Sequence, residues 1–264
     1  MKSTITLVNP YNQSPLQKTA EGLLQSLKNV FPYKNGAYRI VQDDNYTQNF
    51  GYQWNSFVGT QVDKTSNLDL SKQRFFVETG WDKEDLTNQN ILEVGSGAGR
   101  FSQIVLDHTN ANLYSVDYSN AVEANFKNNG PSERLQLFQA SIYEMPFAKA
   151  QFDKVFCLGV LQHTPDVKRS VQCLLEMAKL HSKYIFRPFT KNMTHEKLLK
   201  LIEKNVDWMI KAQQFFTKIK LGKIVNRFIP LCDISGTLPK GLSKAQLREM
   251  CILDTFDMFS PQYD

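Results

Sequence analysis

The stretch ILEVGSGAGRF, residues 91–101, decides the fold, because it joins an aliphatic strand to a helix through glycines at every second position. Gly95, Gly97 and Gly99 let the chain turn sharply and let a ligand approach the backbone, whose free N–H groups point at it. The stretch therefore predicts a ligand-binding β–α turn. A tight turn without any ligand is the alternative for such a motif taken alone.

The spacing of the glycines separates classes of cofactor. A dinucleotide fold has G-x-G-x-x-G, whose third glycine would fall on Arg100, whereas this chain has G-x-G-x-G preceded by Glu93. NAD and FAD are therefore disfavoured, and the sequence holds no G-x-x-x-x-G-K-[ST] phosphate loop. Asp117 ends the next apolar run, where a carboxylate can accept hydrogen bonds from both hydroxyls of a ribose. A ribose-bearing cofactor fits.

The region around this turn alternates between apolar runs and helical patterns. The sequence predicts strands near 91–95, 112–117, 135–139, 154–159 and 183–187, and helices after Gly97, around 119–128 and from Thr164 to about 180. Such alternation predicts an α/β fold, a Rossmann-like doubly wound and mostly parallel sheet. Thr164, Pro165 and Asp166 provide a cap, a first-turn proline and a first-turn acid for the last of these helices.

The flanks are less regular. Residues 33–41, YKNGAYRIV, predict a hairpin with an Asn35-Gly36 turn, interpreted as an adjunct outside the core. A helix is expected over 71–81, with Ser71 as its N-cap and Gly80 as its C-cap. We expect an N-terminal arm or lid with a lead-in helix over 1–85, a cofactor-binding core over 86–190 and a basic helical region over 191–264.

Four segments, in order, resemble the motifs of class I S-adenosylmethionine-dependent methyltransferases of the type 11 group. They are the opening stretch, YSVDYS (114–119), QASIYEMPF (139–147) and FDKVFCLGVLQHTPD (152–166). The resemblance covers about residues 70–190. It implies the class I methyltransferase fold and S-adenosyl-L-methionine as cofactor. That family has seven strands, whereas five are predicted here, so either the last strands go unrecognised or the chain ends before them.

The resemblance also implies roles for individual residues. The glycine turn would back onto the methionine part of the cofactor, Glu93 would face its amino group and Asp117 would hold the ribose. Ser141 departs from the family, which often has aspartate there, and a hydroxyl is a weaker acceptor for the adenine amino group. The implied cofactor contacts are Glu93, Gly95, Ser96, Gly97, Gly99, Asp117, Tyr118, Ser141, Ile142 and Leu158.

Methyl transfer from a sulfonium needs in-line positioning and, for a hydroxyl acceptor, a base. His163 is the best candidate, because the loop after the fourth strand borders the methyl group in the family. The alternative is a loop histidine with only local contacts. His108, His181 and His195 lie at expected helix ends and are weaker candidates.

Two N-terminal segments leave alternatives open. Residues 45–63 resemble the lead-in segment of some bacterial type 11 members, which predicts either a lid over the cofactor or a packed arm. The NPYN of residues 9–12 is similar to the Asn-Pro-Pro-Tyr motif of adenine amino-methyltransferases, but it lacks the second proline. A nucleic-acid substrate is therefore disfavoured.

The charge is concentrated near the C-terminus. Residues 191–228 contain nine Lys/Arg and three acids, 9 − 3 = +6, against +5 for the whole chain. Two apolar stripes in 195–228 predict a helical cap packed on the domain or on a partner. The less favoured alternative is a surface for an anionic membrane or a lipid-linked acceptor. Nothing in the rest of the chain suggests a nucleic-acid surface.

The cysteine content indicates the cellular compartment. Four scattered cysteines without a C-x-x-C pair indicate neither disulfides nor a metal site, and we expect a cytoplasmic protein. The sequence thus predicts a methyltransferase for a small-molecule acceptor, with oxygen as the methylated atom. A sugar, a glycan precursor and a lipid-linked metabolite all remain open as acceptors, and a cofactor-binding scaffold or inactive partner is the alternative function.

Overall fold

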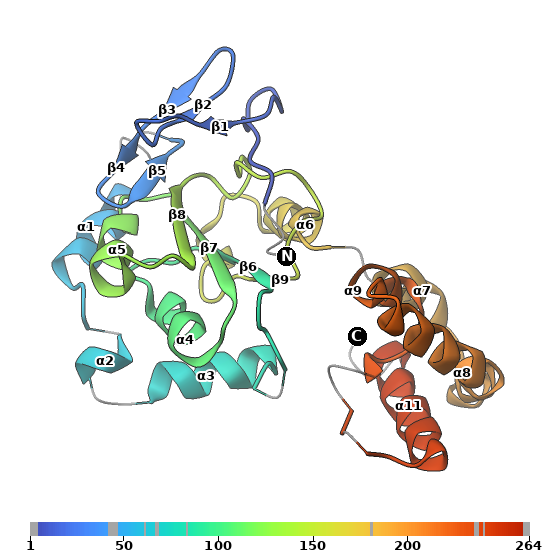
Figure 1. Cartoon of the computed structure of the whole chain (residues 1–264). Helices are drawn as coiled ribbons and strands as arrows, with labels where there is room; N and C mark the ends of the chain where they lie inside the picture. The colour runs from blue at the N-terminus through green and yellow to red at the C-terminus, as the bar shows by residue number, and fades with distance from the viewer. Residues whose placement is uncertain are drawn as a thin grey trace. The chain divides into compact units, whose positions relative to one another are not determined.

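The protein forms two compact units, Met1–Lys179 and Leu180–Asp264. The computed structural model describes residues 5–41, 47–60, 62–66, 69–82, 84–179, 182–234, 238–239 and 241–260. The first unit holds the sheet and the glycine turn, and the second is helical (Figure 1). The expected arm and most of the expected core thus fall in one unit, while the lid role of residues 1–85 stays a prediction.

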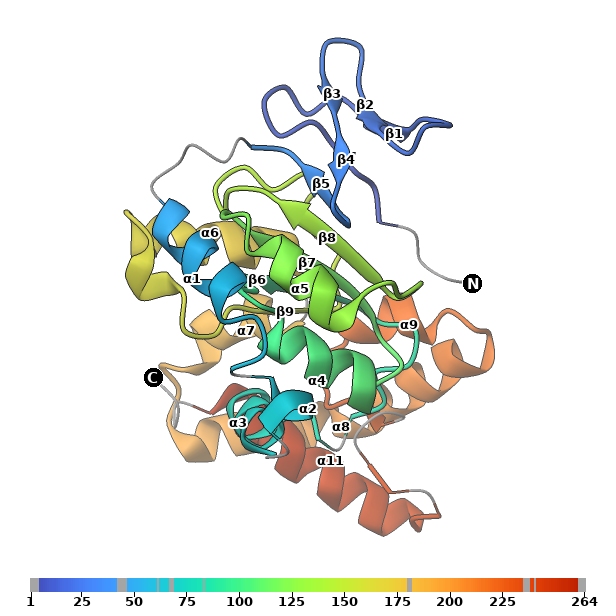
Figure 2. The ribbon, with the colours of Figure 1, turned by 90° about the vertical axis from the view of Figure 1, so that its left-hand side faces the viewer.

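The main sheet of the first unit has the strand order β4-β5-β8-β7-β6-β9 (Figure 2). All neighbouring strands run parallel except the β4–β5 pair. This is the predicted Rossmann-like, mostly parallel sheet. Its strands are β4 (Tyr33–Lys34), β5 (Ala37–Arg39), β6 (Asn90–Val94), β7 (Asn112–Asp117), β8 (Leu135–Gln139) and β9 (Lys154–Phe156).

Four of the five predicted strands are confirmed as β6, β7, β8 and β9, but the strand expected at 183–187 is wrong. The chain forms a helix there, α7 (Ser182–Thr190). A short apolar run does not distinguish strand from helix by its pattern, so tertiary partners decide. Here Phe186 contacts the Phe259 ring, and the Thr190 hydroxyl donates to the Phe259 carbonyl at 3.0 Å, all within the second unit. In the described residues an isolated parallel bridge joins Phe152, shortly before β9, to Ala178.

The predicted hairpin at 33–41 is confirmed, but its description as an adjunct is wrong. Asn35 and Gly36 have φ of 50° and 84°, as a two-residue hairpin turn requires. Strand β5 then pairs in parallel with β8 and extends the sheet. Ala37 and Tyr38 are buried as a result. A small separate sheet of β1 (Gln17–Lys18), β2 (Leu24–Gln25) and β3 (Val30–Phe31) precedes the hairpin.

Helices and N-terminal residues cover the two faces of the sheet. Alternate strand residues face opposite sides, so Ile91 packs with α3 and α4 while Leu92 packs with α6 and with N-terminal residues such as Leu24 and Phe31. Helix α5 covers β5 and β8 through Val122. The helices are α3 (Leu70–Thr79), α4 (Arg100–His108), α5 (Val122–Asn129) and α6 (Val167–Met177), with α1 (Gln48–Ser56) and α2 (Asp63–Ser66) before them.

The predicted helix caps are partly wrong. Gly80 ends α3 with φ of 67°, as expected for a left-handed C-cap. Ser71, however, lies inside the first turn of α3, where its hydroxyl accepts a hydrogen bond from Arg100 Nε at 2.8 Å. Helix α6 is capped by Asp166, which accepts from the Arg169 N–H at 2.9 Å, and not by Thr164. The carboxylate of Asp166 is a stronger hydrogen-bond acceptor than the hydroxyl of Thr164, which favours Asp166 as the N-cap.

The second unit packs two long helices against each other, α8 (His195–Lys218) and α11 (Lys244–Phe259). Thr194 caps α8, and Ser243 opens α11 with a capping box to Gln246. Between them lie α9 (Gly222–Val225) and η2 (Asn226–Phe228). None of the helices in the described ranges is long and apolar enough to cross a membrane.

Candidate functional site

The strand order makes β6 the topological switch point of the sheet. The chain places β7 and then β8 on one side of β6 and returns to place β9 on the other. Loops that leave the carboxyl ends of β6 and β9 therefore run in opposite directions, and open α/β sheets bind ligands at such a switch point. The glycine turn follows β6, and the loop with η1 (Leu161–His163) follows β9.

The glycine turn uses the freedom that only glycine has. Gly95, Gly97 and Gly99 have φ of 81°, 51° and 82°. A Cβ at Gly95 would lie 2.3 Å from Val160 Cγ2, so the loop after β9 lies directly against the turn. The Gly95 N–H donates to the Val116 carbonyl at 2.7 Å. The turn is thereby bonded to the end of β7 and lies against the loop after β9.

Asp117 ends β7 next to the glycine turn, as the sequence predicts. Its Oδ2 accepts the Gly97 N–H at 2.8 Å. Its Oδ1 accepts the N–H and the hydroxyl of Ser119 at 2.9 and 2.7 Å. Burial raises the pKa of this carboxyl above its usual range, against the effect of these hydrogen bonds. The carboxylate is therefore held at the strand end, at the position where a ribose is held in folds of this topology.

Glu93 is buried on β6, directly before the glycine turn. On β6 it shares the face of Ile91, so its side chain is directed towards α4. The hydroxyls of Ser102 and Ser115 both donate to its Oε2, the second at 2.8 Å. Burial raises the pKa of Glu93 to about 7, although these hydrogen bonds act in the other direction. Its observed partners lie within the protein, and contact with a cofactor amino group stays a prediction.

Two asparagines on α5 hold the glycine turn and a third holds the start of α4, and sequence reasoning missed them. Asn128 Nδ2 donates to the Ala98 carbonyl at 2.7 Å, and Asn129 Nδ2 donates to the Gly99 carbonyl at 2.9 Å. Asn125 Nδ2 donates to the Ser102 hydroxyl at 2.8 Å. Asparagine is a poor helix former, so three of them within the stretch ANFKNN were a usable signal of a role other than helix formation.

Helix α1 contacts the loops at the switch point. A Cβ at Gly97 would lie 3.1 Å from Trp54 Nε1. The ring centroids of Phe50 and His163 are 5.1 Å apart. Asn55 Nδ2 donates to the carbonyl and to the side-chain oxygen of Asn120, at 3.2 Å each. One helix therefore contacts the loops after β6, β7 and β9.

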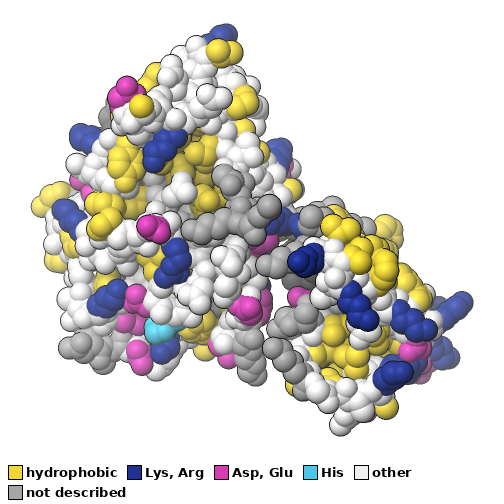
Figure 3. Space-filling model, viewed as in Figure 1, with side chains coloured by type: hydrophobic (Ala, Val, Ile, Leu, Met, Phe, Trp, Pro, Cys, Tyr) yellow, Lys and Arg dark blue, Asp and Glu magenta, His cyan; other side chains and the backbone are white. Residues whose placement is uncertain are grey.

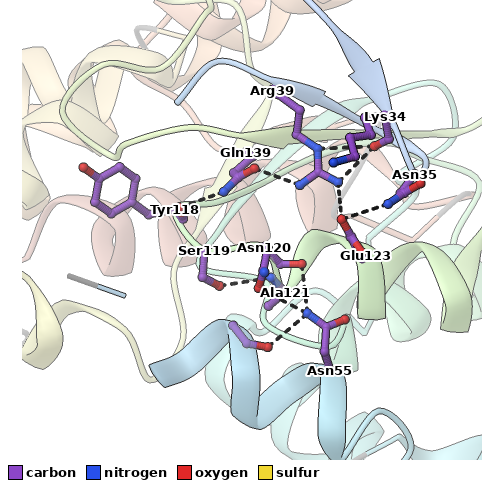
Figure 4. Close-up of polar contacts among 11 residues, drawn as sticks. Lys34, Asn35, Arg39, Asn55, Tyr118, Ser119, Asn120, Ala121, Glu123 and Gln139 are labelled. Carbon is purple, nitrogen blue, oxygen red and sulfur yellow. Dashed lines mark hydrogen bonds and ion pairs between the residues drawn. The ribbon is translucent and has the colours of Figure 1, made fainter. Parts of the chain in front are cut away.

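The loop after β7 is also braced from the N-terminal hairpin (Figure 4). Arg39 on β5 donates to Glu123 Oε1 at 2.7 Å and to Gln139 Oε1 at 2.8 Å. Gln139 Nε2 in turn approaches the Tyr118 carbonyl at 3.5 Å, while the Tyr118 ring points away from this network. The network thus holds the backbone of Tyr118, the predicted adenine-side residue, and its ring takes no part in the network.

The remaining predicted residues lie in the loops after β8 and β9. Ser141 is buried, and its hydroxyl accepts the Tyr143 N–H at 3.2 Å. Ile142 belongs to the hydrophobic cluster beneath the N-terminal residues, and Leu158 packs against the cluster around Phe75. His163 is exposed at the end of η1.

Other candidates lie elsewhere or are chemically unsuited. His108 ends α4 and His195 begins α8, while His181 lies outside the described residues. Asn9 of the NPYN segment is buried in the N-terminal region and donates to Ser26 and Asn29. Burial raises the pKa of the nearby Cys157 thiol to about 12, so it is not a nucleophile at neutral pH.

Comparison with known proteins agrees with this geometry. A family model described as a methyltransferase domain matches residues 92–186, which include the end of β6, the glycine turn, Asp117 and the loop after β9. This core is a class I methyltransferase domain. S-adenosylmethionine is the cofactor of that family, and the predicted recognition, fold and cofactor are thereby confirmed at the level of the family.

Curated relatives match part of this chain at low identity. A ubiquinone biosynthesis O-methyltransferase of Coxiella burnetii is 28% identical over 109 residues, which are 40% of this chain and 46% of the relative. A tRNA U34 carboxymethyltransferase of Nautilia profundicola is 30% identical over 84 residues, 31% of this chain and 28% of the relative. The match thus spans less than half the length of these relatives. Their acceptors do not establish the acceptor here.

A solved structure is similar over a larger part of the chain. It is a putative S-adenosylmethionine-dependent methyltransferase of Methanococcus maripaludis, 16% identical, with a TM-score of 0.36. The similarity covers 63% of this chain and 82% of that one.

The methyltransferase domain offers chemically suitable groups for the family cofactor. The Ser96 hydroxyl is buried in the glycine turn and has no hydrogen-bond partner in the described part of the chain. A buried hydroxyl without a partner is costly, and a ligand carboxylate would remove that cost. Together with the positive-φ glycines and the carboxylate of Asp117, this hydroxyl fits the amino-acid end and the ribose of S-adenosylmethionine.

Proposed function

We propose that this protein transfers a methyl group from S-adenosylmethionine to an oxygen atom of a small-molecule acceptor. One observation carries the proposal: the glycine turn holds an unpartnered buried hydroxyl, Ser96, beside a carboxylate, Asp117, at the switch point of a methyltransferase domain. Oxygen as the methylated atom is supported by the matched relatives named as O-methyltransferases. An inactive, cofactor-binding scaffold is the alternative.

The cofactor would supply a methyl group that is already activated on a sulfonium. The protein then has to position the acceptor in line with that methyl group and to remove the proton of the acceptor hydroxyl. Ser96 and the turn backbone would orient the amino-acid end. Asp117, whose oxygens are aligned by Gly97 and Ser119, would accept hydrogen bonds from the ribose hydroxyls. Tyr118, Ser141, Ile142 and the backbone of Leu158 would complete the contacts to the adenine and the methionine part.

His163 would accept the proton of the acceptor hydroxyl. Its loop touches the glycine turn through Val160, which supports a position at the methyl end of the cofactor. An imidazole can exchange a proton near neutral pH. The Phe50 ring lies beside it and would restrict its orientation.

Helix α1 would serve as the cover of the site, the role predicted for the N-terminal arm. Its contacts to Gly97, Asn120 and His163 support this, because a cover has to reach every loop at the switch point. Closing such a cover excludes water from the reacting groups. The indole of Trp54 would then lie against the cofactor.

The first test is cofactor binding by the Asp117→Ala variant. Loss of hydrogen bonds to a charged group should weaken S-adenosylhomocysteine binding by about 1–3 kcal/mol in isothermal titration. Asp153→Ala is the matched control, because Asp153 also accepts a backbone N–H, that of Asn90, but at the opposite end of β6. Equal affinities of the folded variants would remove Asp117 from the site.

The second test separates the enzyme from the scaffold. In assays on pooled metabolites His163→Ala should lower turnover by about 10²–10⁴-fold and leave S-adenosylhomocysteine affinity unchanged. The control is Gln162→Ala, in the same short helix, where the side chain donates to the Gly159 carbonyl. Unchanged turnover in His163→Ala would refute the role of His163 as the base. If the unaltered protein bound the cofactor but methylated none of the acceptors, the result would favour the cofactor-binding scaffold.

A further inference from the structure

Helix α8 has a buried apolar face and, on another side, a row of exposed apolar side chains. Its buried face is formed by Leu198, Ile202, Val206, Met209, Ile210 and Gln213. This face belongs to the clusters that α8 shares with α11 within the second unit, and packing of a helical cap on the methyltransferase domain or on a partner stays a prediction. The helix nevertheless keeps large apolar side chains on its other side.

The second face carries an apolar row of Leu201, Trp208 and Phe215. Seven residues make almost two full turns of an α-helix, so the three side chains lie nearly in line along α8. Leu201, Trp208 and Phe215 are 44%, 52% and 57% exposed. Ile219, at the end of the helix and 46% exposed, continues the row. Contiguous exposed apolar surface of this kind marks an interaction site.

A row of lysines runs alongside the apolar row with the same period. Lys197, Lys204, Lys211 and Lys218 are all exposed. Three of them follow the apolar residues at a spacing of three, which makes them direct neighbours on the helix surface. In the described ranges none of these lysines forms an ion pair. Figure 3 shows Lys and Arg side chains beside hydrophobic ones on the visible face of this unit.

The acidic residues of α8 lie on the side of the lysine row away from the apolar row. Asp207 pairs with Arg248 of α11 at 3.1 Å. Glu203 lines, with Arg248 and apolar side chains, a hollow of about 640 Å³ between α8 and α11. The lysine row and the apolar row are therefore left without competing acids between them.

We propose that this face of α8 docks on the surface of an anionic lipid bilayer. Charge complementarity to anionic headgroups comes from the lysine row, and the apolar row would enter the headgroup–acyl boundary. Tryptophan is enriched at that boundary. The Trp208 Nε1–H already donates to Asn205 Oδ1 at 2.9 Å, so the indole enters without an unpaired polar group.

A nucleic acid fits this face less well. Phosphate recognition needs cationic contacts but gains nothing from three large apolar side chains arranged in line among them. An interfacial helix uses both features at once. The apolar row is also straight and belongs to a single helix, which suits a flat surface.

Vesicle sedimentation of the full chain tests the proposal. Vesicles of phosphatidylcholine with phosphatidylglycerol should bind the protein, and pure phosphatidylcholine vesicles should bind it at least tenfold more weakly. Binding should fall as salt is raised. Replacing the four lysines of the row by glutamine, and separately Phe215→Ser, should each lower affinity at least tenfold. Trp208 emission should shift to the blue on binding, and Trp208→Phe should remove that shift.

The matched control replaces four exposed lysines of the first unit, Lys18, Lys28, Lys34 and Lys127, by glutamine, which removes the same net charge. This control should bind vesicles as the unaltered chain does. Equal loss of binding in the control and the lysine-row variant would reduce the effect to net charge and overturn the proposal. So would absence of binding to anionic vesicles, or tighter lysine-row-dependent binding to a duplex RNA. A double Lys204→Gln, Lys211→Gln variant replaces the quadruple one if that fails to fold.

Discussion

Helix α5 carries several asparagines and helix α8 several lysines, and the two sets of side chains face opposite ways. The asparagines of α5 face inward and donate to the glycine turn and its surroundings. The lysines of α8 face outward and contact no acid in the described residues. Buried polar groups fix a geometry because leaving one unpaired is costly, whereas exposed charges leave the fold almost unaffected. Substitutions should therefore damage stability around α5 and only binding around α8.

The largest effect should come from Gly99→Ala, in the turn that α5 braces. A Cβ there would lie 2.2 Å from Asn125 Oδ1 and 2.3 Å from Asn129 Nδ2, and Gly99 has φ of 82°. The left-handed conformation costs about 1–2 kcal/mol for a residue with a Cβ, and displacing the asparagines adds about 1–3 kcal/mol. Urea unfolding should show a loss of about 2–5 kcal/mol.

Gly80→Ala is the matched control for that loss. Gly80 has φ of 67°, but a Cβ there meets nothing within 4 Å. Only the backbone strain of about 1–2 kcal/mol applies. If both variants lost the same stability, the contacts of α5 with the turn would contribute nothing, and the contrast between the two helices would fail.

Glu93 should make the stability of the domain depend on pH. Its pKa of about 7 in the folded protein exceeds the ordinary value of 4.5, so the folded state binds the proton more tightly than the unfolded state. The resulting stabilisation is complete below about pH 4.5 and is lost as pH rises through 7. At about 1.4 kcal/mol per pKa unit, a difference of about 2.5 units makes this loss on the order of 3–4 kcal/mol.

The Glu93→Gln variant isolates this effect. The amide keeps an oxygen that accepts from Ser102 and Ser115 but does not ionise. Melting temperatures measured from pH 4.5 to 8 should fall for the unaltered chain relative to the variant. If the melting temperatures of the two proteins changed with pH in parallel, Glu93 would be ionised in both the folded and the unfolded state. Water would then reach its carboxylate beside the two serines.

The sequence was sufficient for the elements whose signals are local. Strands β6 to β9, the Asn35-Gly36 turn, Gly80 and the position of Asp117 all follow from periodicity, from turn chemistry or from the spacing of one motif. Each of these signals depends on neighbours in the chain, which a single sequence displays.

What failed depends on partners distant in sequence. The run at 183–187 is helical because of Phe259, and β5 belongs to the main sheet because β8 offers it an edge. The asparagines of α5 required knowledge of which helix passes the glycine turn.

The smallest effect should come from Lys211→Ala on α8, and it is informative because it is small. Lys211 is exposed and is one of the lysine row without an ion pair in the described residues. Alanine is the best helix former, so the free energy of unfolding should change by no more than about 0.5 kcal/mol in either direction. Asn125→Ala is the inward counterpart, since it removes the donor to the Ser102 hydroxyl, and should cost about 1–3 kcal/mol. A clear loss in Lys211→Ala would mean that α8 uses this lysine to hold its own unit together, and its outward face would then be structural.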